Sequence, residues 1–136
     1  MNATIDRLSR QILHSLRQSA RLNLADSPIV QLIDLADRVC LDERVASYIV
    51  HIVTATRSNP DIKLGSSPRG SISLYALAKA YALYQGRNYV IPDDVKYLAP
   101  YVLGHRIMLT HTAKTEKKNP ADIISNILSA IVVPVA

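Results

Sequence analysis

Apolar residues recur at intervals of three and four positions along most of this chain, and this spacing predicts amphipathic helices. Local signals mark where they begin and end: prolines at first helical positions, Asp42, Ser67 and Asn119 as N-caps, and Gly86 as a left-handed terminal residue. The pattern predicts helices over residues 4–20, 28–38, 45–57 and 68–85, from 92 to near 104, and from 120 to about 131.

The strongest patterns lie in the middle of the chain. The spacing within residues 45–57 predicts one buried face, formed by Val45, Tyr48, Ile49, Ile52, Val53 and Thr56. The helix over 68–85 is apolar almost all round, which predicts a central place in the core. Pro100 is expected to kink or shorten the helix that begins at Pro92. Residues 111–118 are polar and charged, and they predict a loop.

Short links at 39–41, 62–64 and 89–91 leave room for only brief extended segments. The pattern therefore predicts an all-α fold, a compact helical bundle of five or six helices. Residues 1–25 are expected to form a basic amphipathic N-terminal helix and connector, and residues 26–136 are expected to form the main helical domain.

Composition limits the class of protein. A chain of 136 residues with 49% hydrophobic residues is large enough for one domain with a core of its own. The lone Cys40 excludes an internal disulfide, lies in an apolar context that favours a buried thiol, and is typical of the cytoplasm. No signal peptide or membrane span is visible, and the apolar C-terminal segment 127–136 is expected to pack on the domain or on a neighbour.

The net charge of +5 is modest, but four arginines (Arg7, Arg10, Arg17 and Arg21) lie within the first 21 residues. A basic helix of this kind can mark a surface for nucleic acid or membrane, but a solvated face is the preferred interpretation. A helix-turn-helix is a weak alternative, because the loop between the helices 45–57 and 68–85 is too long for that motif.

Most catalytic motifs are absent from the sequence. The spacing of Gly65 and Gly70 resembles that of a phosphate-binding loop, but Ser71 and Ile72 follow where Lys and Ser or Thr are required. This chain alone is therefore not expected to hydrolyse ATP, and no cofactor is expected for it alone. The four histidines match no metal spacing, so no metal site is predicted, and His51 is read as a buried, hydrogen-bonded residue. The pair Asp93 and Asp94 fits a helix start better than paired catalytic carboxylates.

One residue stands out against this background. Arg69 lies in the first turn of the helix over 68–85, where the positive end of the helix dipole disfavours a cation. An arginine becomes favourable there when it meets an anion, because a guanidinium adds charge-assisted hydrogen bonds to phosphate oxygens. The alternative is a solvated surface arginine.

Four segments in order strengthen the first interpretation: 48–57 (YIVHIVTATR), 64–71 (LGSSPRGS), 86–95 (GRNYVIPDDV) and 102–107 (VLGHRI). Together they resemble the C-terminal helical lid of MoxR-type AAA+ ATPases, over roughly residues 29–134. The ATPase core of that family lies outside this sequence, and the first 25 residues do not look like the family's usual junction.

The resemblance implies that Arg69 is the sensor-2 arginine, which contacts the γ-phosphate of ATP. Gly65, Ser66 and Ser67 would let the loop approach the nucleotide, while 86–94 and 105–106 serve packing and capping. ATP and magnesium would be used only by the full-length protein. Expected partners are the protein's own ATPase core, neighbouring subunits of a hexamer, and a client protein in a chaperone-like maturation or metal insertion.

The competing hypothesis is a free-standing helical module that binds nucleic acid, or acts as an adaptor, through the basic first helix. It depends on the four arginines alone, so the lid interpretation is preferred.

Overall fold

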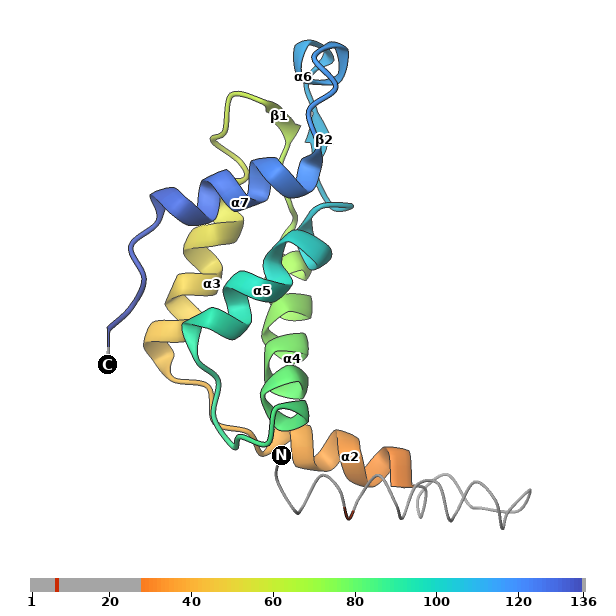
Figure 1. Ribbon diagram of the computed structural model, residues 1–136, viewed down its shortest axis with the longest axis vertical. Coiled ribbons are helices and arrows are strands. Elements are labelled where there is room, and N and C mark those ends of the chain that lie inside the picture. The colour runs from red at the N-terminus through yellow and green to blue at the C-terminus, as the bar shows by residue number, and fades with distance from the viewer. Residues whose placement is uncertain (1–6, 8–27, 136) are drawn as a thin grey trace, which may run out of the picture.

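The computed structural model describes residue 7 and residues 28–135, and the part it describes is an all-α bundle with a very small sheet (Figure 1). The helices of this part are α2 (Pro28–Asp37), α3 (Glu43–Ala55), α4 (Pro68–Tyr84), α5 (Pro92–Leu103), α6 (His111–Thr115) and α7 (Pro120–Ala130), and the strands are β1 (Ile62–Leu64) and β2 (Met108–Leu109). The all-α prediction is thus confirmed, whereas the predicted first helix lies almost wholly outside the described residues.

Helix α3 carries the centre of the core. All six residues of its predicted face are buried, and α3 packs on α4, α5 and α7 (Figure 1). Asp42 is its N-cap, as predicted, and accepts a hydrogen bond of 2.8 Å from the backbone N–H of Arg44. The spacing that buries this face turns His51 away from it. His51 is therefore exposed, and its prediction as a buried histidine is wrong.

Helix α4 packs against α2, α3 and α5, so its predicted central position is confirmed. It is not buried all round, however. One stripe of mostly small residues faces the core (Gly70, Leu74, Ala78 and Ala82), while Ile72 on the opposite side is 68% exposed. The neighbouring helices cover only one side of α4, which leaves several apolar side chains on its outer side in solvent.

Two further expectations needed correction. Helix α5 continues through Pro100 as far as Leu103, so the proline does not shorten it, and the kink that was the other expected outcome stays a prediction. The predicted loop over residues 111–118 contains the short helix α6. This helix forms because Thr110 caps it, accepting a hydrogen bond of 3.2 Å from the N–H of Ala113, whose side chain is buried.

The short links pair with one another. Strand β1 pairs antiparallel with β2, and Cys40 forms an isolated parallel bridge with Tyr89. In this extended link Val39 is buried and Leu41 is half-buried. Because side chains alternate along an extended segment, Cys40 points outward, and its prediction as a buried thiol is wrong.

The last helix, α7, starts at Asn119 as predicted, with the side-chain oxygen accepting a hydrogen bond of 3.0 Å from the N–H of Ala121. Ile127 and Leu128 pack into the core, but Val132 and Val135 beyond them are exposed. Among the described residues, none of the helices combines the length and the apolar character that a transmembrane segment needs.

Candidate functional site

The candidate site is the loop of residues 65–67 together with the first turn of α4, and the end of α3 holds this loop in place. The Oγ1 of Thr56 accepts a hydrogen bond of 3.0 Å from the N–H of Ser66, and the Nε of Arg57 donates one of 3.2 Å to the carbonyl oxygen of Ser66. A Cβ at Gly65 would lie only 2.8 Å from the backbone of Arg57. Glycine is therefore required for this close approach, and contacts from both Thr56 and Arg57 hold the loop in place.

Gly70 makes a second close contact, between the loop and the first turn of α4. A Cβ on this glycine would lie 2.0 Å from the Oγ of Ser66 and 3.0 Å from a methyl group of Leu103. Ser66 is itself buried, and its hydroxyl donates to the carbonyl oxygen of Ser67 at 3.1 Å. The side chain of Ser66 thus positions the loop from inside the domain.

Ser67, Pro68 and Arg69 form the exposed tip of this rigid element. Ser67 occupies the predicted N-cap position in an extended conformation, but its side chain makes no capping hydrogen bond. Within residues 28–135, no carboxylate or carbonyl oxygen pairs with the guanidinium of Arg69, and α4 has no acidic residue in its first turn. The tip therefore presents a cation beside a helix N-terminus, an arrangement that attracts an anion.

The acidic pair at the start of α5 has a structural role, as predicted. Asp94 is buried, accepts a hydrogen bond of 2.9 Å from the N–H of Ile91, and forms an ion pair with Arg87 through both of its oxygens. The hydrogen bond to Asp94 raises the pKa of Arg87 above its ordinary value. Asp93 is exposed next to it. This corner is an internal cap and ion pair.

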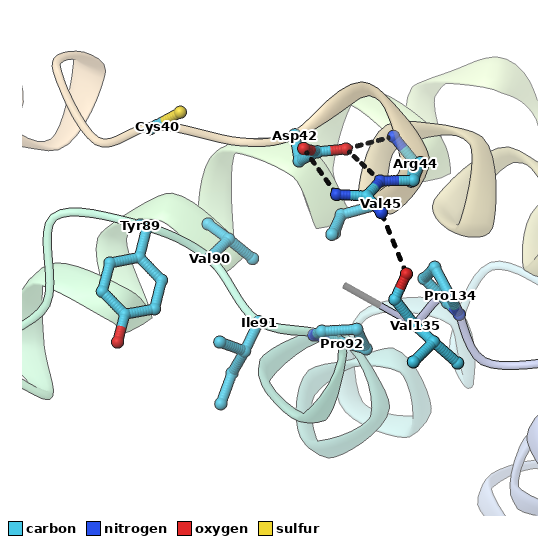
Figure 2. Close-up of a pocket in the computed structure, with 10 residues that line it drawn as sticks. All are labelled: Cys40, Asp42, Arg44, Val45, Tyr89, Val90, Ile91, Pro92, Pro134 and Val135. Carbon is cyan, nitrogen blue, oxygen red and sulfur yellow. Dashed lines mark hydrogen bonds and ion pairs between the residues drawn. The ribbon is translucent and has the colours of Figure 1, made fainter.

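A hollow of 310 Å³ lies beside the C-terminal segment, and Figure 2 shows ten residues that line it. Its polar groups satisfy each other. Asp42 bonds Arg44, and Arg44 also donates to the carbonyl oxygen of Val135 at 2.9 Å. The hydrogen bonds that the side chain and the backbone N–H of Arg44 donate to Asp42 lower the pKa of Asp42 below its ordinary value. Cys40 is one of the residues that line the hollow (Figure 2), and it is exposed.

Other predicted chemistry is just as limited. Across the described residues, no group of three or more His, Cys, Asp or Glu side chains is placed to hold a metal ion. The basic segment on which the nucleic-acid hypothesis depends lies outside the described residues, except for Arg7, which is exposed.

Sequence reasoning identified Arg69 and its loop, but it missed the residues that hold them. Thr56 was predicted only as part of a buried face, and Arg57 only as the end of a helix. Nothing local signals their bonds to Ser66, because that contact joins positions nine and ten residues apart across a loop.

Comparisons with known proteins bear on the site. A profile of the AAA lid domain family matches residues 54–127, a stretch that includes the loop and all of α4. The chain is 52% identical over 94 residues to the uncharacterized protein YeaC of Bacillus subtilis, covering 69% of this chain and 29% of YeaC. It is 33% identical over 124 residues to the chaperone MoxR1 of Mycobacterium tuberculosis, covering 85% of this chain and 33% of MoxR1.

A solved structure agrees with these matches. The crystal structure of a candidate ATPase from Cytophaga hutchinsonii superposes with a TM-score of 0.76 at 31% sequence identity, covering 79% of this chain and 36% of the other. The chain therefore spans about a third of the length of the proteins that it matches.

Proposed function

The chain belongs to the AAA lid domain family and is the lid of a MoxR-type AAA+ ATPase, and from this premise we propose that Arg69 is its sensor-2 residue. In the full-length protein its guanidinium binds the γ-phosphate of ATP and stabilises the charge that develops during hydrolysis. One observation carries this proposal: Arg69 is exposed, has no partner among the described residues, and lies on a tip that the rest of the domain holds rigidly.

The loop contributes to the site in two ways. Gly65 and Ser66 fix the position of the tip through their contacts with α3, and Ser67 leaves the first turn of α4 without a side-chain cap. Backbone N–H groups at an uncapped helix start are suitable partners for phosphate oxygens. We therefore assign to Gly65 and Ser66 the approach of the loop, and to Ser67 and Arg69 the contact with the nucleotide.

Magnesium would have to be bound elsewhere, because the described residues provide no cluster of metal ligands. We assign the ion to the phosphates and to the part of the protein that precedes the lid. When bound, it neutralises phosphate charge. The lid contributes its arginine and moves with nucleotide state, as other elements ordered by a γ-phosphate do.

The wider function follows from the same relatives. MoxR1 is named a chaperone, and by analogy the full-length protein would act as a chaperone-like ATPase in protein maturation or metal insertion. Its own ATPase core and neighbouring subunits of a hexamer would be its first partners, with the client unidentified. A cytoplasmic location stays a prediction.

The decisive experiment measures ATP turnover by the full-length protein. Arg69→Ala should lower turnover at least ~10-fold, the loss typical of one charge-stabilising donor. Arg38→Ala is the matched control, because Arg38 is also exposed but lies just after α2, which packs on α4. Its turnover should stay within about 2-fold of the parent. Unchanged turnover in Arg69→Ala would remove the sensor-2 assignment.

A further inference from the structure

Arg106, whose guanidinium is only partly hydrogen-bonded, lies in an open groove between α4 and the end of α5. The groove has a volume of 580 Å³, and its apolar lining includes Ala76, Leu77, Ala80, Tyr101 and Val102. Leu77 and Tyr101 are 42% and 69% exposed, although both are large apolar side chains. We call this region, with Arg106 at its edge, the α4–α5 groove.

Arg106 is only partly satisfied there. One Nη donates to the Oγ of Ser73 at 3.1 Å, while the Nε is inaccessible to water and has no hydrogen-bond partner among the described residues. Buried N–H groups are normally paired, and more so when they carry charge. No carboxylate compensates Arg106: α4 contains no acidic residue, and neither does the stretch 95–107. His105 adjoins it on the same groove.

Tyrosine rings continue from Tyr101 along the seam where α4 and α5 pack together. The rings of Tyr81 and Tyr97 are stacked with centroids 5.2 Å apart, and those of Tyr97 and Tyr101 are 5.7 Å apart. Tyr97 and Tyr101 are both exposed. Tyrosine and arginine are the residues that most often dominate binding energy at interfaces, because they combine apolar area with a polar group.

We propose that the α4–α5 groove binds an acidic, apolar segment of a separate polypeptide. The apolar side chains of that segment pack between Leu77, Ala80 and Tyr101, and its Asp or Glu carboxylate accepts hydrogen bonds from the Nη groups of Arg106. The charge of the groove selects a carboxylate, since a cationic segment would be repelled.

The aromatic character of the seam favours a partner that binds transiently. Hydroxyl-bearing rings tolerate water when the partner leaves, whereas permanent interfaces resemble a hydrophobic core. Exposed aliphatic residues of that second kind occur elsewhere, at Ile29 and Ile33 of α2 and Ile72 of α4.

The test uses short random peptides displayed on phage, selected against the chain, with the strongest binder then made as a synthetic peptide. Selected peptides should share an Asp or Glu beside apolar residues. Changing that acid to its amide, or Arg106→Gln in the protein, should weaken binding at least ~10-fold, as expected for the loss of a charge-assisted pair. Ala80→Glu should weaken it similarly without threatening the fold, because Ala80 is exposed and mid-helix.

Two variants serve as controls. Val50→Glu introduces the same charge on the exposed side of α3, and Arg69→Gln removes an exposed arginine outside the groove. Neither should change peptide affinity by more than about 2-fold. Because Arg69 is a control here, failure of the sensor-2 assignment and failure of this proposal give separate results.

Several results would overturn the proposal. The proposed pairing of a carboxylate with Arg106 would be contradicted if the selected peptides contained no acidic residue. It would also be contradicted if neither Arg106→Gln nor Ala80→Glu changed the affinity. Sedimentation that shows a dimer of the chain, dissolved by Ala80→Glu, would identify a second copy as the occupant. Peptides that bind the chain but not the full-length protein would show that the groove is filled by the same protein's own core.

Discussion

Helix α4 has an arginine near each end, and the two differ in every contact. Arg87, just after the C-terminal end, forms an ion pair with the buried carboxylate of Asp94, at 2.8 Å through one Nη, and also donates to the carbonyl oxygen of Tyr89 at 2.9 Å. Arg69, in the first turn, is exposed and pairs with no group in the part of the chain that the structure describes.

The difference separates a structural arginine from one available for binding. Arg87 closes a turn that Gly86 opens with φ of 84°, and so joins the end of α4 to the start of α5. Arg69 stabilises nothing inside the domain, yet Gly65, Ser66 and Gly70 hold its backbone tightly. A rigid backbone under an unsatisfied side chain is the arrangement that a preorganised binding site requires.

The largest expected effect tests the structural arginine. Arg87→Ala leaves the carboxylate of Asp94 buried without its cation, so the free energy of unfolding should fall by about 3 kcal/mol. Arg69→Ala should leave it unchanged or raise it by up to about 0.5 kcal/mol, because a cation is removed from a helix start. Urea unfolding followed by circular dichroism measures both. Equal losses of unfolding free energy in the two variants would contradict the distinction between a structural Arg87 and an Arg69 that is available for binding.

A smaller effect is expected from a change in the packing between Gly70 and Ser66, which holds the backbone of Arg69 in place. Gly70→Ala should destabilise the domain by about 2 kcal/mol, because the added methyl overlaps the Oγ of Ser66. The double variant Ser66→Ala with Gly70→Ala removes that oxygen and should recover part of the loss. Thermal unfolding of the parent and of both variants measures these changes in stability. Gly70→Ala as stable as the parent would contradict the tight packing of the loop.

The smallest effect concerns an unsatisfied group that is buried instead of exposed. The hydroxyl of Tyr48 is inaccessible to water and has no partner among the described residues. Tyr48→Phe should therefore stabilise the domain at neutral pH by about 1 kcal/mol, whereas the equally unpaired but exposed Arg69 carries no such penalty.

The same tyrosine has a predictable pH dependence. Burial, and then the charge of Asp93, raise the pKa of Tyr48 above its ordinary value of 10.0. The folded pKa is higher than the unfolded one, so the folded state holds the phenol proton more tightly. The stability associated with this proton is present in full below pH 10.0 and is lost as the pH rises through the folded pKa. Tyr48→Phe should flatten that alkaline decline in urea unfolding, and an unchanged decline would contradict the assignment to Tyr48.

The sequence by itself determined the local structure. The N-caps Asp42 and Asn119, the start of α4 at Pro68, the left-handed Gly86 and the buried face of α3 all follow from residues within one or two turns of each other. The unusual charge of Arg69 was also visible, since the helix dipole makes a cation there anomalous without any tertiary information.

Only the tertiary structure decided burial and pairing. Three features depend on segments brought together from distant positions. They are the side of α4 that is covered, the exposure of Cys40, and the hydrogen bonds of Arg57 and Thr56 to Ser66. Helix formation depends on neighbours a few residues apart, whereas the cost of an unpaired group depends on what surrounds it in space. That is why a residue pattern could single out Arg69, but only the fold could show that this arginine is free and Arg87 is not.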